Sequence, residues 1–95
     1  MTTYVILSRL APDAFKDPKE LKQIATTVAE KIKDECPAVT WKASYLTLGR
    51  FDVVDIVESN DLKQLELAAL IIRGYGHAAT ETMQATVWSD FIGAL

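Results

Sequence analysis

The chain has 95 residues, of which 49% are hydrophobic, and its formal net charge is −3. This length predicts one domain over residues 1–95, with a small core that oligomerisation would help to stabilise. The mildly acidic and interspersed charges exclude a basic nucleic-acid-binding surface, and no apolar run is long enough to cross a bilayer. We therefore expect neither nucleic acid nor a membrane as a partner.

The expected location of the protein is the cytoplasm. Cys36 is the only cysteine, so no disulfide framework of a secreted protein is present. The first residues carry no basic segment followed by a small-residue cleavage site, which a signal peptide would require.

A strand and a helix are predicted first along the chain. Residues 4–10 form a short apolar run rich in strand formers. Asp17 is a typical N-cap, and Pro18 suits the first helical position because its missing N–H group has no intrahelical partner there. Apolar residues then recur at helical spacing. The helix is expected to end near Glu35, because Pro37 disfavours helical conformation in the residue before it.

A hairpin, a second helix and a last strand follow. Alternating β-branched and aromatic residues predict strands over residues 39–48, 52–58 and 80–88, with a turn between the first two. A helix is predicted over residues 62–73, and Gly74 stands where a left-handed residue commonly ends a helix. The order β-α-β-β-α-β predicts a ferredoxin-like α+β fold. This fold has a four-stranded antiparallel sheet of order 4-1-3-2 and two helices on one face.

The predicted hairpin assigns side chains to the two faces of the sheet. An even loop places Tyr45 opposite Val54 and Ser44 opposite Asp55, and directly opposed residues share a face. A buried carboxyl group without partners is unfavourable, so Asp55 is expected on the face away from the helices. The helix-facing residues would then be Trp41, Tyr45, Val54 and Ile56, and the opposite face would carry Phe51, Val53, Asp55 and Val57. An odd loop would invert the contribution of residues 39–48.

Both faces of the sheet are therefore apolar, which is unusual for an antiparallel sheet with one face in water. A large apolar patch of this kind marks an interface, and the simplest cover is a second copy of the sheet. Tyr4, Thr82, Gln84, Thr86 and Trp88 are expected on the same open face. With Asp55 they would line a cavity between two sheets, suited to a small organic ligand.

The hairpin also carries a family resemblance. Leu48-Gly49-Arg50-Phe51-Asp52-Val53-Val54 resembles the signature of the GYD-domain family, and residues 4–7 and 80–82 look like its pattern. The resemblance implies a dimeric α+β barrel, in which two ferredoxin-like sheets pack face to face. Phe51 stands where the family usually has tyrosine, so no role for a phenolic hydroxyl is carried over.

The candidate site residues are few. Asp55 and His77 are the candidate catalytic bases, and the candidate ligand-binding residues are Tyr4, Ser44, Phe51, Asp52, Asp55 and Trp88. Asp52 has a structural alternative, in which it accepts hydrogen bonds from loop N–H groups. His77 and Cys36 show no metal-ligand spacing, so neither a metal site nor a cofactor is predicted.

Three functions remain open at this point. The first is a homodimeric domain that binds or senses a small molecule between its sheets. The second is a small cofactor-independent enzyme of the dimeric α+β barrel type, oxygenase-like or isomerase-like, with Asp55 or His77 as base. The third is a structural or partner-binding protein that uses the apolar surface of the second predicted helix.

Overall fold

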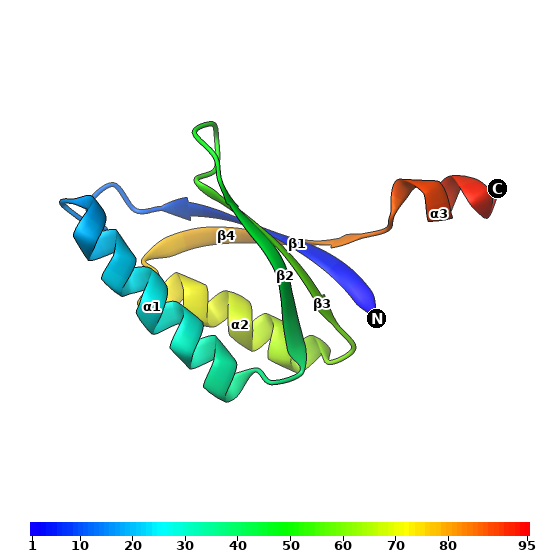
Figure 1. Ribbon diagram of the computed structural model, residues 1–95, viewed down its shortest axis with the longest axis horizontal. Helices are drawn as coiled ribbons and strands as arrows, with labels where there is room; N and C mark the ends of the chain where they lie inside the picture. The colour runs from blue at the N-terminus through cyan, green and yellow to red at the C-terminus, as the bar shows by residue number, and fades with distance from the viewer.

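The computed structural model describes residues 1–95 and shows one sheet with two long helices on the same side (Figure 1). Its elements are β1 (Thr2–Leu10), α1 (Pro18–Glu35), β2 (Val39–Leu46), β3 (Val53–Ser59), α2 (Leu62–Tyr75), β4 (Ala78–Ala85) and α3 (Trp88–Gly93). The sheet order is β2-β3-β1-β4 with every neighbouring pair antiparallel, which confirms the predicted ferredoxin-like topology. None of the helices is long and apolar enough to cross a membrane.

Helix α1 begins and ends where its capping residues predict. The Asp17 side chain accepts hydrogen bonds from the backbone N–H groups of Lys19 and Glu20, so it satisfies two donors of the first turn. The Glu20 side chain in turn accepts from the N–H of Lys16, ahead of the cap. At the other end the N–H of Cys36 donates to the carbonyl of Ile32, 2.8 Å away, just before Pro37.

Helix α2 runs two residues further than predicted. Gly74 lies inside the helix and has no positive φ, so the expectation of a left-handed Gly74 is wrong. The C-cap is Gly76, whose N–H donates to the carbonyl of Ile72. The left-handed residue is His77, with a φ of 51°, and it begins the turn into β4. Helix α2 therefore ends at Tyr75 with Gly76 as its C-cap, and not at Gly74.

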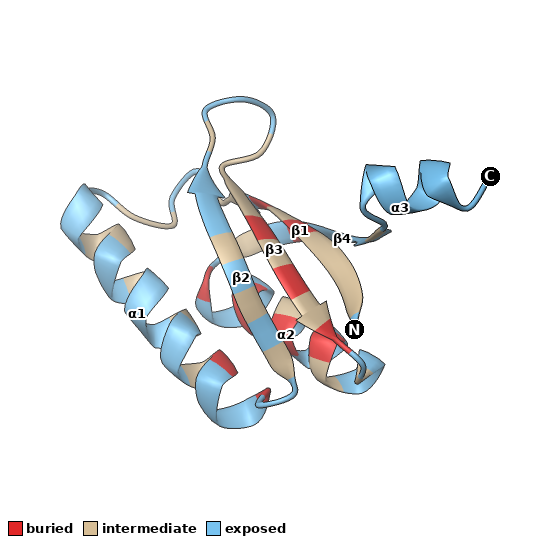
Figure 2. Ribbon diagram, turned by 45° about the vertical axis from the view of Figure 1, so that its right-hand side comes forward, coloured by how far each residue is buried: buried red, intermediate tan, exposed pale blue.

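The core lies between the sheet and the two helices. Ile6 of β1 and Val57 of β3 are fully buried from the sheet side, and α2 contributes most of the helical core. The core cluster is completed by Ile32, Cys36, Leu65, Ala68, Ile71 and Ile72. In Figure 2 α1 is exposed along most of its length, and Ile32 is its only buried residue. Helix α1 thus covers its half of the sheet incompletely.

The two faces of β3 are the reverse of the predicted ones. The register is as expected for the pairs Tyr45–Val54 and Ser44–Asp55. However, Asp55 and Val57 are buried on the helix side, so Val54 and Tyr45 lie on the open face. The prediction was wrong because it assumed that no partner for a buried carboxyl group was available under the helices.

Strand β2 also contains an irregularity that the pattern did not show. Its register shifts between Trp41 and Ala43, which leaves Lys42 as an extra residue. Trp41 therefore pairs with Val57 rather than with Glu58, and it lies on the same face as Ser44. Its predicted position on the helix side is confirmed, since it packs against the core cluster.

The chain beyond β4 leaves the body of the protein. Strand β4 ends at Ala85 rather than at residue 88, and the following segment carries α3 away from the sheet (Figure 1). No residue of α3 is buried, and the side chain of Trp88 is 74% exposed. Thr82 and Gln84 lie on the helix side with Ile6 and Tyr4, and Met83 and Ala85 on the open face, the reverse of the expected arrangement.

Candidate functional site

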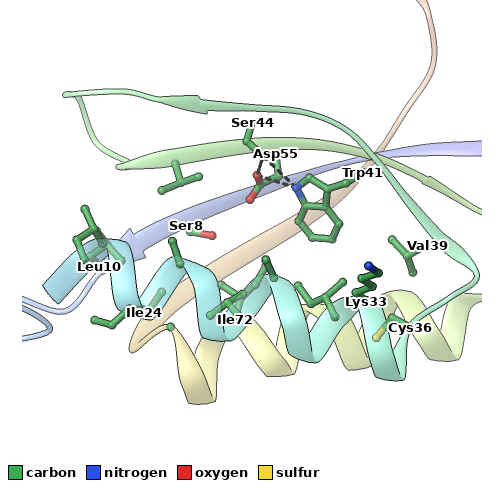
Figure 3. A pocket seen from close by; sticks show the side chains of 18 of the residues that line it. Ser8, Leu10, Ile24, Lys33, Cys36, Val39, Trp41, Ser44, Asp55 and Ile72 are labelled. Carbon is green, nitrogen blue, oxygen red and sulfur yellow. Dashed lines mark hydrogen bonds between the residues drawn. The ribbon is translucent and has the colours of Figure 1, made fainter. Parts of the chain in front are cut away.

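A cleft of about 620 Å³ separates α1 from the β2–β3 side of the sheet (Figure 3). It exists because α1 packs mainly against α2 and stands off the strands. Thirteen of its 19 lining residues are hydrophobic. Those that α1 contributes are Leu21, Ile24, Ala25, Val28, Ala29 and Ile32. A concave apolar site of this volume, with a few polar groups, is typical of small-molecule binding sites. We call it the α1 cleft.

Four side chains with polar atoms lie on the sheet side of the α1 cleft: Ser8, Trp41, Ser44 and Asp55. We call them the polar cluster. The Oδ1 atom of Asp55 accepts hydrogen bonds from Trp41 Nε1 at 3.0 Å and from Ser44 Oγ at 2.5 Å. Trp41 Nε1 also lies 3.0 Å from Ser44 Oγ. These two donors explain how the Asp55 side chain, which is only 6% exposed, is accommodated beneath a helix.

The polar cluster contains two groups without a hydrogen-bond partner in the chain, the second carboxyl oxygen of Asp55 and the Ser8 hydroxyl. Asp55 Oδ2 accepts no hydrogen bond from the chain. Ser8 is 3% exposed, and its Oγ atom is the one buried side-chain polar atom in the protein with no hydrogen-bond partner. Buried polar groups are almost always paired, so the unpaired Ser8 hydroxyl requires an explanation. Both unpaired groups border the same cleft.

The structure brings together only two of the sequence-predicted ligand residues, Ser44 and Asp55. They meet inside one chain, between the sheet and α1, and not on the open face, where a cavity between two sheets would lie. Tyr4 lines a different groove, between α2 and β4, together with Thr82 and Gln84. Trp88 lies on the projecting α3 and lines neither cavity.

The GYD-like motif lies at the end of the β2–β3 hairpin, and of its residues only Val53 lines the α1 cleft. Asp52 joins this hairpin to β1: its Oδ2 atom accepts from the N–H of Leu10 at 2.8 Å, and its own N–H donates to the carbonyl of Ser8 at 2.8 Å. The Arg9 guanidinium lies 5.5 Å from the centre of the Phe51 ring. These contacts give Asp52 and Phe51 a structural part at the strand ends.

His77, the other candidate base, is exposed and is not among the residues that line the α1 cleft. Its carbonyl accepts a hydrogen bond from the N–H of Ala11 at 2.9 Å, which holds the turn before β4. Asp55 and His77 therefore do not share a site. No group of three or more histidine, cysteine, aspartate or glutamate side chains that could hold a metal ion is present.

Cys36 lines the α1 cleft near the end of the helix. Burial, together with the nearby charge of Glu35, raises the pKa of the Cys36 thiol above its ordinary value of 9.0. A raised pKa keeps the thiol protonated, and the thiolate is the reactive form. The side chain therefore acts as a small apolar wall of the cleft.

Sequence reasoning missed two members of the polar cluster. Ser8 interrupts the apolar alternation of β1 on the face of Ile6, and this isolated hydroxyl was the available signal. Trp41 was expected to be a core residue, and its role as a donor to Asp55 depends on the β2 bulge. No pattern in the sequence predicts that bulge.

The element order β-α-β-β-α-β, with a four-stranded antiparallel sheet of order β2-β3-β1-β4 and two helices on one face, defines a ferredoxin-like α+β protein. The chain belongs to the GYD-domain family, whose model matches residues 4–95.

The chain resembles known proteins over nearly its whole length. It is 28% identical over 99 residues to the "Glutamine synthetase and cystathionine beta-lyase binding protein" of Thermus thermophilus, covering 100% of this chain and 99% of that protein. It resembles the crystal structure of a hypothetical protein from Pyrococcus horikoshii, with 28% identity, a TM-score of 0.57 and coverage of 92% of each chain. A Thermus thermophilus structure shares the fold at 21% identity, with a TM-score of 0.55 over 92% of this chain and 95% of that one.

Proposed function

We propose that this protein is a homodimeric domain that binds a small organic molecule in the α1 cleft. The observation that carries the proposal is the pair of unpaired acceptors, Ser8 Oγ and Asp55 Oδ2, beside a mostly apolar cavity. The chain supplies no hydrogen bonds to either atom, although Ser8 Oγ is buried, where polar groups are almost always paired. A ligand with a donor group at one end and an apolar body would supply them and fill the cleft.

The dimer part of the proposal rests on the open face of the sheet. This face carries Val5, Leu7, Tyr45, Val54, Ile56 and Met83, and no element of the chain covers it. Contiguous apolar surface of this kind marks an interface in soluble proteins. The resemblance to dimeric α+β barrels supports a second sheet as the cover, which leaves each α1 cleft on the outside of the dimer.

The dimer is tested by light scattering coupled to size-exclusion chromatography. Wild-type protein is expected to elute with twice the mass of one chain, and Val54→Glu is expected to give a folded monomer, because a charge then lies in the sheet interface. Thr27→Glu introduces the same charge at an exposed position of α1, on the other side of the sheet, and serves as the control. A monomeric wild type over a wide concentration range would contradict the dimer.

Ligand binding is tested by a thermal-shift screen of small organic molecules, repeated on two phenylalanine variants of α1. Ala25 lines the cleft, so Ala25→Phe is expected to fill it and to abolish stabilisation by any hit. Thr27 is exposed on the same helix but does not line the cleft, so Thr27→Phe should leave stabilisation unchanged. If no compound stabilises the protein, or if both variants respond alike, the α1 cleft is not the binding site.

A second candidate function is binding to another enzyme. The relative named as a glutamine synthetase and cystathionine beta-lyase binding protein matches this chain end to end. Helix α2 offers an exposed apolar surface for such a partner, formed by Leu62, Leu67 and Leu70. The test is biolayer interferometry with the purified cognate enzymes. Leu70→Glu should weaken binding and Lys63→Glu, on the same helix, should not; equal binding by both would exclude this surface.

A further inference from the structure

We propose that the ligand of the α1 cleft is an amine, whose ammonium group binds Asp55 Oδ2 and Ser8 Oγ while its apolar body lies along α1. This inference rests on the proposed ligand-binding function and specifies the chemical class of the ligand. It follows from the hydrogen-bond acceptors, the charges and the walls of the cleft.

The unpaired groups of the polar cluster both offer acceptors to a ligand. The donors within the cluster, Trp41 Nε1 and Ser44 Oγ, are already directed at Asp55 Oδ1. The free positions are Asp55 Oδ2, which is only an acceptor when ionised, and the Ser8 hydroxyl, which can accept through its lone pairs and can also donate its proton. Figure 3 shows the Ser8 hydroxyl and the Asp55 carboxyl group in the same part of the cleft. A ligand group with several N–H donors can donate to Asp55 Oδ2 and to the lone pairs of Ser8 Oγ at the same time.

The charges around Asp55 favour a cation over a neutral donor. The one ion pair in the protein joins Lys42 Nζ and Glu58 Oε1, 3.9 Å apart, and no basic side chain reaches Asp55. Lys33 lines the cleft from α1, but its side chain is exposed. Buried carboxylates are normally paired with a positive group. An ammonium ion supplies both the hydrogen bonds and the missing charge, whereas an alcohol supplies only a hydrogen bond.

The apolar walls of the α1 cleft indicate the chemistry of the rest of the ligand. Leu21, Ile24, Val28 and Ile32 lie along one side of the cleft, at helical spacing, and present only aliphatic side chains. Each methylene group that leaves water for such a surface contributes about 0.8 kcal/mol. The geometry therefore points to an amine with an extended aliphatic or aromatic body. A carboxylic acid of the same length would bring its negative charge against Asp55.

The experiment compares three probes of equal length: n-octylamine, n-octanol and octanoate, each below the concentration at which it aggregates. Two-dimensional ¹H–¹⁵N NMR follows the indole N–H of Trp41, which donates to Asp55 and so reports directly on the site. The second indole signal belongs to Trp88 and is assigned with Trp88→Phe. Octylamine is expected to shift the Trp41 signal in a saturable way and to bind about tenfold more tightly than octanol, because hydrogen bonds to charged groups are the stronger ones. Octanoate should not bind.

Two variants test which side chains cause the tighter binding of octylamine, and a third serves as the control. Asp55→Asn removes the charge and retains an oxygen acceptor, so octylamine and octanol should then bind equally. Ser8→Ala removes the hydroxyl group and leaves Asp55 unchanged, so the affinity for octylamine should fall severalfold. Asp13→Asn removes an exposed loop carboxyl group and should preserve the preference for the amine. The NMR spectrum of each variant also shows whether it is folded.

The outcomes separate this inference from the function on which it rests. If octanol or octanoate binds as tightly as octylamine, with shifts confined to cleft residues, the amine inference is overturned and the cleft remains a binding site. If octylamine shifts residues outside the cleft, or if Ala25→Phe does not reduce its binding, the inference is likewise overturned. If none of the probes, and no compound of the thermal-shift screen, perturbs the cleft residues, the proposed function fails as well.

Discussion

The substitution Asp52→Ala tests whether the GYD-like motif has a structural role. Asp52 connects β1 to the hairpin in two ways: its side chain accepts from Leu10 N at 2.8 Å, and its N–H donates to Ser8 O at 2.8 Å. Its carbonyl also accepts from Thr47 N at 2.9 Å, within the hairpin. Alanine retains the two backbone hydrogen bonds and removes the side-chain one. The half-buried N–H of Leu10 is then left without its partner.

The expected loss of stability in Asp52→Ala follows from that single lost hydrogen bond. Removing one partner of a hydrogen bond that is shielded from water lowers the free energy of unfolding by about 1–3 kcal/mol. In a chain of this size, each kcal/mol corresponds to roughly 4–8 °C in the melting temperature. Asp52→Asn retains an acceptor oxygen at the same position and should therefore lose less than half as much. No change in ligand binding is expected, because Asp52 does not line the α1 cleft.

The assay is urea denaturation followed by far-UV circular dichroism at one fixed protein concentration, because association makes apparent stability concentration-dependent. Wild type, Asp52→Ala and Asp52→Asn are compared under identical conditions. The reasoning is refuted if Asp52→Ala leaves the unfolding curve unchanged. It is also refuted if Asp52→Asn is as unstable as Asp52→Ala, since the acceptor would then have no effect.

Three further predictions concern the core, the end of α2 and the buried thiol. Ile6→Ala should lower the free energy of unfolding by about 2–5 kcal/mol, because Ile6 is fully buried; a loss below 1 kcal/mol in urea denaturation would contradict its place in the core. Gly74→Ala should stabilise α2 by up to about 1 kcal/mol, because its added Cβ meets nothing within 4 Å. Gly76→Ala should destabilise by about 1–3 kcal/mol, because its Cβ would approach the Ile72 carbonyl oxygen to 2.4 Å; the same sign for both glycine variants in thermal melts would refute this. The raised pKa of Cys36 stabilises the folded state below pH 9.0, and this contribution is lost as the pH rises through the raised value, so stability should fall more steeply above pH 9.0 in wild type than in Cys36→Ala.

The fold was predictable because its signals are local. Asp17, Pro18 and Pro37 bound α1 through the covalent and capping chemistry of their own positions, and the hairpin pairs follow from alternation about one turn. The end of α2 was not predictable in the same way. Gly74 and Gly76 both suit a helix end, and only the packing of Ile72 and Val28 around Gly76 distinguishes them.

The candidate site was predicted in part. Ser44 and Asp55 were correctly paired, because opposed residues of a hairpin share a face. The predicted face of Ser44 and Asp55 was wrong, because a carboxyl group under the helices was expected to lack partners, whereas Trp41 donates to it from the same sheet. That donor is available only through tertiary structure, which no spacing in the sequence encodes. Asp55 is an exception to the rule that carboxyl groups do not lie in the interior, and it borders the cleft with the strongest functional indication.

The bulge in β2 determines which of two neighbouring side chains lies beside Asp55. In a regular ladder, Lys42 would stand opposite Val57 on the helix side, and Trp41 would turn to the open face. The extra residue reverses this choice: the indole enters the cleft, and the Lys42 ammonium remains outside, 3.9 Å from Glu58. A protein of the same length and composition, but with a regular β2, would carry its own cation beside Asp55. One irregular residue thus places an uncharged indole donor, rather than a lysine ammonium group, next to Asp55.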